Sequence, residues 1–166
     1  MSKETSRHVY IHESVLSESR RVFRKTRSLY RRHESIVYWA GREDRDALVV
    51  TTCIAPNAKT TAGSFRTSAS SNAHAISRTN ELGLAILAQV HTHPGPCTEH
   101  SNGDSAGALM PYDGFYSLVI PGYGTRPLWP LTTAGVYVYL RGRFVRLGAT
   151  EIQNVFRLLP ALVDLR

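Results

Sequence analysis

The sequence contains little cysteine and lacks any long apolar run. Its two cysteines, Cys53 and Cys97, are far apart and have no CxxC spacing, so we do not expect a disulfide between them. No apolar run approaches the ~20 residues that a membrane-spanning helix needs. The polar N-terminal segment, residues 1–7, has no apolar core of the kind found in signal peptides. We therefore expect a cytoplasmic protein with no membrane partner.

Acidic residues are few relative to basic ones. The chain has 20 Lys and Arg residues against 13 Asp and Glu residues, which gives a formal net charge of +7. Much of the excess lies in one segment and comprises Arg20, Arg21, Arg24, Lys25, Arg27, Arg31 and Arg32. This segment is either the solvated face of a helix or a docking surface for an acidic partner. We see no basic repeat interleaved with aromatic residues and no helix-turn-helix pattern, so we expect no nucleic-acid partner.

The apolar pattern predicts one α/β (or α+β) domain over residues 1–166, with its core at about 8–148. Its length of 166 residues and hydrophobic content of 42% suit a single buried core. Apolar segments predict strands at residues 8–11, 35–41, 47–55, 84–93, 115–120, 133–140 and 144–147. Helices are predicted at residues 14–32, 72–82 and about 150–165, and a loop at residues 58–71. This alternation favours a three-layer sandwich with helices flanking a mixed central sheet.

The clearest chemistry stands at the end of the predicted strand at residues 84–93. His91 and His93 lie two residues apart, so on a strand their imidazoles point to the same face. Pro94 then ends the strand and starts a loop, which can return to present Asp104 as a third ligand. Two imidazoles and a carboxylate suit zinc, with one coordination position left to water. We therefore predict one catalytic Zn²⁺ held by His91, His93 and Asp104.

Three further residues are candidates near this metal. Ser101 precedes Asp104 by three residues, which suits a helix N-cap, and its hydroxyl could also hydrogen-bond an oxyanion formed beside the metal. Glu34 lies where a predicted helix gives way to a strand, and it is the candidate general acid/base. Cys97 falls in the loop between the predicted ligands. It is either an ordinary loop residue or a thiol that acts near the metal.

Taken together, these residues resemble the JAMM (MPN-plus) metalloprotease family. The resemblance rests on Glu34 followed by Gly41, the HTHP sequence at residues 91–94 and the SNGD sequence at residues 101–104, and it extends over roughly residues 8–148. It implies a cytidine-deaminase-like JAB/MPN fold with one zinc held by the residues predicted above. It also implies that Glu34 is the general acid/base and that Ser101 stabilises the oxyanion.

The resemblance further implies a substrate. Members of the family cleave isopeptide or peptide bonds after the C-terminal glycine of ubiquitin or ubiquitin-like proteins, whose extended tails usually lie beside the site as an added strand. The chain departs from the family pattern at Val37, where Gly is common, and residues 105–115 carry no long insertion. It looks more like the stand-alone bacterial members found beside ubiquitin-like, E1-like and E2-like proteins, several of them in antiphage operons. We therefore expect a zinc isopeptidase that processes or deconjugates a ubiquitin-like protein.

Other functions remain open at this point. The same fold serves in non-catalytic MPN-type scaffolds that dock partner subunits, and a zinc hydrolase of this kind could instead process a sulfur-carrier protein. Nucleic-acid binding through the basic segment is a more distant alternative. Since all five functional positions are intact, the sequence favours an enzyme over a scaffold.

Overall fold

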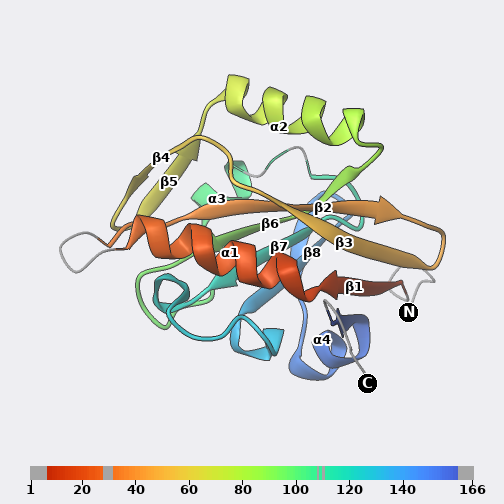
Figure 1. Ribbon diagram of the computed structural model, residues 1–166. Helices are drawn as coiled ribbons and strands as arrows, with labels where there is room; N and C mark the ends of the chain where they lie inside the picture. Colours follow the sequence, from red (N-terminus) through yellow and green to blue (C-terminus); the bar gives the residue numbers. More distant parts are fainter. Residues whose placement is uncertain (1–6, 28–31, 108, 110, 161–166) are drawn as a thin grey trace, which may run out of the picture.

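The computed structural model describes residues 7–27, 32–107, 109 and 111–160, and this part of the chain is organised around one mixed sheet (Figure 1). The strand order is β10-β1-β3-β2-β6-β7-β8-β9. The strands are β1 (His8–His12), β2 (Ile36–Glu43), β3 (Ala47–Ile54), β6 (Ala85–Thr92), β7 (Tyr116–Ile120), β8 (Gly135–Leu140), β9 (Arg143–Arg146) and β10 (Phe156–Leu159). A separate hairpin pairs β4 (Ala58–Thr61) with β5 (Ser64–Thr67).

Helices cover both faces of this sheet. The helices are α1 (Glu13–Thr26), α2 (Ala69–Glu81), α3 (Asn102–Ala106) and α4 (Ala149–Val155). Figure 1 shows α1 and α2 on opposite sides of β2 and β6. In the described part of the chain, no helix combines the length and apolar character needed to cross a membrane.

The alternation of side chains along β2 explains the three layers. Val37 and Trp39 belong to the same buried cluster as the α1 residues Val15, Leu16 and Phe23. Their neighbours on β2 (Ile36, Tyr38 and Ala40) belong to the cluster that contains Ala75 of α2. Successive strand residues point to opposite faces, so a strand that is apolar throughout requires cover on both sides. The predicted α/β class, with a mixed sheet between helices, is confirmed.

Gly41 allows β2 and β3 to approach closely at a bulge. The register between them shifts between Ala40 and Gly41, and a Cβ added at Gly41 would lie 1.8 Å from the Val49 carbonyl oxygen. Because that oxygen belongs to a paired backbone, relief would require the strands to separate. We expect Gly41→Ala to lower the free energy of unfolding by about 3 kcal/mol, as measured by urea denaturation.

Gly63→Ala is the matched control for this substitution. A Cβ added at Gly63 meets no atom within 4 Å, so this variant should change the free energy of unfolding by less than about 0.5 kcal/mol. Equal effects of the two substitutions would contradict the close approach at Gly41.

The first helix ends earlier than its apolar spacing predicts, at Thr26 rather than near residue 32. Arg27 is extended, with φ −122° and ψ 113°, and it forms an isolated antiparallel bridge with Arg32. The His33 N–H donates to the Thr26 carbonyl at 3.0 Å. The carbonyl at the end of the helix thus accepts a hydrogen bond from His33, later in the chain, instead of from a further helical turn. The rest of the predicted helix, residues 28–31, lies outside the described residues.

The predicted loop at residues 58–71 is wrong, because these residues form the β4–β5 hairpin and the start of α2. Ala58 and Phe65 are partly buried against the cluster on the α2 side of the sheet, which gives the hairpin an apolar face. Ser68 caps α2, and its side chain accepts from the Ser71 N–H at 3.1 Å. A composition rich in Ser and Thr suits strands as well as loops when one face packs on the core.

The predicted C-terminal helix at about 150–165 is also wrong beyond its first half. Helix α4 ends at Val155, and Phe156–Leu159 forms β10, which pairs in parallel with β1. Phe156 is buried in the main core against Tyr116. Pairing along an otherwise open edge of the sheet outweighs the helical spacing of these apolar residues. Residues 161–166 lie outside the described residues.

Candidate metal centre

Two imidazoles and a carboxylate converge at the end of β6. The Nε2 atoms of His91 and His93 lie 3.2 Å apart. Each also faces a different oxygen of Asp104, with His91 Nε2 3.3 Å from Oδ1 and His93 Nε2 3.4 Å from Oδ2. Among the described residues, these three form the cluster of side chains able to hold a metal ion. The structure therefore brings together the three residues that the sequence predicts as ligands.

The strand pairing of β6 fixes where the two histidines point. β6 lies between β2 and β7, and His91 is aligned with Ile36 on one side and Val119 on the other. His91 is consequently fully buried. His93 follows the last residue of β6, and its N–H donates to the Ile120 carbonyl at 2.9 Å. Both rings are held by backbone pairing in the centre of the sheet, which favours a rigid site.

The third side chain is held by a capping box at the start of α3. The Ser101 Oγ accepts from the Asp104 N–H at 3.0 Å, and Asp104 Oδ2 accepts from the Ser101 N–H at 2.7 Å. Such reciprocal bonds satisfy backbone donors at the helix start. Burial would raise the pKa of the Asp104 carboxyl, but the two imidazoles and the Ser101 N–H outweigh it and hold the pKa well below its usual range. Asp104 is therefore an anion in the cluster.

The cluster is compact enough for a zinc site. Ligands about 2.0–2.1 Å from zinc stand about 3.3–3.4 Å from one another at the corners of a tetrahedron, and the two imidazole Nε2 atoms lie 3.2 Å apart. One ligand atom from each of the three residues lies within 4.8 Å of the other two. Burial lowers the pKa of His91 despite the opposing effect of Asp104, which favours the neutral imidazole that binds metals. One feature departs from usual sites. His91 Nδ1 is buried without a hydrogen-bond partner among the described residues, whereas metal-bound imidazoles usually donate from this atom.

Glu34 lies in the same cavity as the cluster. Its backbone N–H donates to the Thr61 carbonyl at 2.8 Å, and the next residue, Ser35, exchanges hydrogen bonds with Thr92 at the end of β6. Glu34 as a whole residue is 4% exposed. Burial raises the pKa of Glu34 to about 7, an effect that His93 opposes and Asp104 reinforces. A bound cation would, like His93, lower the pKa of Glu34. A carboxyl that titrates near neutrality can both accept and release a proton.

The cavity that contains these groups has a volume of about 690 Å³; we call it the metal-site cavity. Its floor includes Glu34, His93, Ser101 and Asp104, and one wall is the consecutive segment 63–67, which contains β5. The predicted acid/base, the oxyanion donor and two of the predicted ligands therefore border one space. The third ligand, His91, is fully buried and does not line the cavity. Cys97 is exposed and carries no disulfide.

The sequence did not predict that Phe65, or the paired side chains of Gln89 and Ser117, lie near the cluster. The Phe65 ring lies 5.1 Å from the His91 ring, measured between centroids. On another side, His100 Nε2 lies 2.8 Å from Ser117 Oγ, which also accepts from Gln89 Nε2 at 3.1 Å. Phe65 is the large apolar side chain in a Ser- and Thr-rich segment. A single aromatic residue in such a segment was the sequence signal that the segment packs against the core. Nothing local in the sequence marks the pairing of Gln89 with Ser117, because it depends on β6 and β7 being neighbours.

An α/β sheet that carries a buried His-His-Asp cluster beside a carboxyl of raised pKa is typical of metal-dependent hydrolases. No family model matches the chain. Over 99 residues it is 30% identical to a probable metalloprotease, y4jG, of Sinorhizobium fredii (strain NBRC 101917 / NGR234), and the match covers 57% of this chain and 60% of that relative. The aligned part thus falls short of two-thirds of the relative's length.

Solved structures resemble the fold. The solution structure of protein DSY2949 from Desulfitobacterium hafniense matches with a TM-score of 0.67 at 17% identity, covering 93% of this chain and 94% of that one. AF2198, a JAB1/MPN domain protein from Archaeoglobus fulgidus, overlaps more loosely, with a TM-score of 0.43 at 17% identity over 84% of this chain and 94% of that one. The chain is thus similar to a probable metalloprotease over part of its length, and the structure brings residues of its HTHP and SNGD segments together in one cluster.

Proposed function

We propose that this protein is a zinc-dependent peptidase that cleaves after the C-terminal glycine of a ubiquitin-like protein, either in a precursor or in an isopeptide conjugate. The observation that carries the proposal is the content of the metal-site cavity. His93 and Asp104 of the metal-binding cluster, the buried carboxyl of Glu34 and a strand segment all border this one space.

His91, His93 and Asp104 would hold the zinc. Zinc in a site with three protein ligands acidifies a water molecule and polarises the carbonyl to be attacked. The Glu34 carboxylate would take a proton from the attacking water and deliver it to the departing amine, a role that suits a buried carboxyl in this cavity. The Ser101 Oγ accepts from the Asp104 N–H, so its own O–H remains able to donate into the cavity, where the oxyanion forms.

The free edge of β5 is suited to an extended peptide. Among the residues that the structure describes, β5 pairs with β4 alone, and residues 63–67 line the metal-site cavity. An unpaired strand edge offers backbone donors and acceptors at regular intervals, so a peptide can add as a further strand. A flexible C-terminal tail that ends in glycine can lie along this edge with its last carbonyl near the metal ligands. Such a tail is what the family's ubiquitin-like substrates supply.

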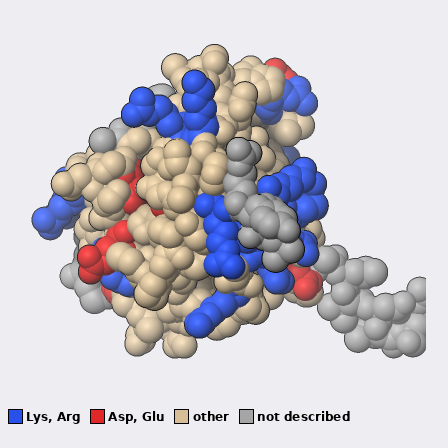
Figure 2. All heavy atoms as spheres, turned by 90° about the vertical axis from the view of Figure 1, so that its left-hand side faces the viewer, with Lys and Arg blue, Asp and Glu red and all other residues tan. Residues whose placement is uncertain are grey.

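The charge of the surrounding surface favours an acidic partner. Figure 2 views the side toward which the C-terminal end of α1 and the β4–β5 hairpin point in Figure 1, and it shows more Lys and Arg than Asp and Glu. Burial together with Arg24, Arg20 and Arg32 lowers the pKa of Arg27, which reflects this crowding of like charges. We extend the proposal to a cytoplasmic setting with E1-like and E2-like proteins, as in a bacterial antiphage conjugation system.

Cleavage of a fusion protein tests the proposed function. The purified, zinc-loaded protein should cleave a ubiquitin-like protein extended beyond its terminal Gly, and mass spectrometry should place the cut after that Gly. Chelation should abolish cleavage and added zinc should restore it. Stoichiometric zinc without cleavage of any ubiquitin-like fusion or conjugate would contradict the substrate, and cleavage that survives chelation would contradict the mechanism.

A further inference from the structure

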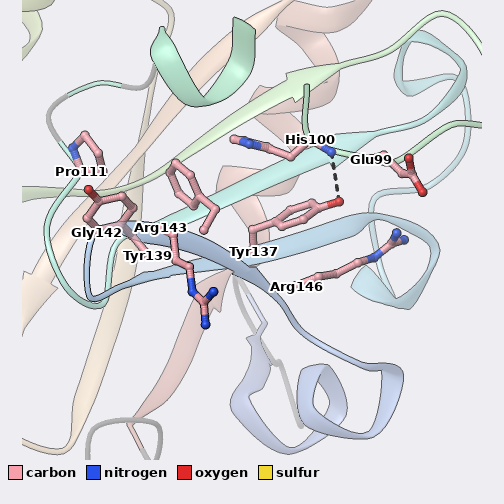
Figure 3. A pocket seen from close by; sticks show the side chains of 9 residues that line it. Glu99, His100, Pro111, Tyr137, Tyr139, Gly142, Arg143 and Arg146 are labelled. Atoms are coloured by element: carbon pink, nitrogen blue, oxygen red, sulfur yellow. Dashed lines mark hydrogen bonds between the residues drawn. The ribbon is translucent and has the colours of Figure 1, made fainter. Parts of the chain in front are cut away.

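A second cavity lies on one face of the β8–β9 hairpin (Figure 3). Its volume is about 560 Å³, which falls within the range of pockets that hold small ligands. The residues that matter to its chemistry are His100, Tyr137, Tyr139, Arg143, Phe144 and Arg146. None of them lines the metal-site cavity. We call this space the aromatic cavity.

Four aromatic rings form part of the wall of the aromatic cavity, those of His100, Tyr137, Tyr139 and Phe144. The hairpin register pairs Tyr137 with Arg146 and Tyr139 with Phe144, so these four side chains share one face of the hairpin. The Phe144 ring lies 5.1 Å from that of Tyr139 and 4.7 Å from that of His100, between centroids. The His100 ring lies 4.9 Å from that of Tyr137, and the His100 N–H donates to the Tyr137 hydroxyl at 3.0 Å. A further planar ring can extend this cluster by stacking.

Positive charge borders the same space. The Arg146 guanidinium carbon lies 5.8 Å from the centroid of the Tyr137 ring, and a guanidinium N–H donates to Thr98 Oγ1 at 2.8 Å. These two contacts hold the group in place. Within the described part of the chain, neither Arg143 nor Arg146 forms an ion pair with a carboxylate.

Glu99 also lines the cavity, and Figure 3 shows it well away from Arg143. The carboxylate that lines the cavity thus lies nearer the Arg146 end than the Arg143 end. A guanidinium left unpaired beside a cavity is well suited to a phosphate, because its planar fork of donors matches the phosphate oxygens.

We propose that the aromatic cavity binds a nucleoside phosphate. The base stacks on the Tyr139 and Phe144 rings and Arg143 binds the phosphate at that end of the cavity, while Arg146 at the other end adds to its positive charge. An acidic peptide with an aromatic residue is the other chemistry that rings and arginines could recognise. The aromatic cavity lies on the face of the hairpin rather than along the outer edge of β9, so an added peptide strand would leave it unfilled. A compact ligand with one ring system and one charged end fits it better.

Isothermal titration calorimetry with AMP tests this site. The protein is first freed of metal with a chelator, because phosphate could otherwise bind at the His-His-Asp cluster. We expect one AMP per chain, with adenosine and inorganic phosphate each binding at least about tenfold more weakly, since each offers only half of the contacts. Arg143→Gln combined with Arg146→Gln should weaken AMP binding at least about tenfold.

Two further variants control for folding and for general charge. Arg143→Gln alone changes an exposed residue and should still weaken AMP binding measurably. Arg45→Gln removes the same charge from the exposed turn between β2 and β3 and should leave AMP binding unchanged. Failure to bind AMP would overturn the proposal. So would binding that the double variant leaves intact, binding that appears only when metal is loaded, or binding of acidic aromatic peptides in place of nucleotides.

Discussion

Replacing Glu34 with Gln is expected to slow cleavage of a ubiquitin-like fusion by about a thousandfold while leaving zinc bound. The glutamine side chain has nearly the same shape but cannot accept and release the proton that must move from water to the leaving amine. Glu34 is 4% exposed and lies in the metal-site cavity, but it is not one of the three clustered ligands. The metal content should therefore stay at one zinc per chain. kcat/KM and metal analysis on the same samples measure both effects.

Glu43→Gln provides the control for this variant. Glu43 is the last residue of β2, is exposed and forms an ion pair with Arg7, so its replacement should leave both turnover and zinc content near wild type. If Glu34→Gln keeps a near wild-type rate, Glu34 is not the acid/base. If it loses its zinc together with its activity, Glu34 contributes to metal binding instead.

Asp104→Asn is expected to weaken zinc binding by more than a hundredfold and to abolish cleavage with it. The change removes the negative charge that faces both imidazoles. Mutating a residue that only supports a ligand lowers metal affinity by ~10–100-fold, and replacing the ligand itself should lower it further. An Asn side chain can still accept from the Ser101 N–H, so the cap of α3 is kept. Competition with a zinc-binding dye would measure the affinity.

Asp113→Asn is the matched control, because Asp113 Oδ1 also accepts a backbone N–H, that of Arg141, at 2.9 Å. This variant should bind zinc as wild type does. A similar loss of zinc in both variants would indicate general damage to the fold. Unchanged zinc affinity in Asp104→Asn would remove Asp104 from the ligand set.

The arrangement of the candidate site followed from local rules of backbone geometry. His91 and His93 share a face because they are two apart at the end of a strand, and Asp104 is held because Ser101 caps the short helix α3. Strand alternation and helix capping depend on neighbours in the sequence, so they could be predicted. Ser101 can serve both as the N-cap of α3 and as a donor to an oxyanion. Its hydroxyl accepts the capping hydrogen bond, and the residue also lines the metal-site cavity.

What the sequence could not predict depends on contacts between distant segments. The β4–β5 hairpin is stabilised where Phe65 packs beside His91, and β10 forms because β1 offers an unpaired edge. Helix α1 stops where the chain returns to pair Arg27 with Arg32. In each case pairing with a distant segment outweighed the secondary structure that the local sequence favours, because such local preferences contribute little free energy per residue. The hairpin matters most for function, because it supplies the wall on which the proposed substrate would lie.

X-ray absorption spectroscopy of the zinc-loaded protein tests the central claim most directly. We predict one zinc per chain with four nitrogen or oxygen ligands at about 2.0–2.1 Å, two of them showing the scattering of imidazole rings. That result would match the His91, His93 and Asp104 cluster with one position left for water. A sulfur ligand at about 2.3 Å would implicate a cysteine such as Cys97 and contradict this ligand set. Failure to bind zinc stoichiometrically would contradict the metal centre itself.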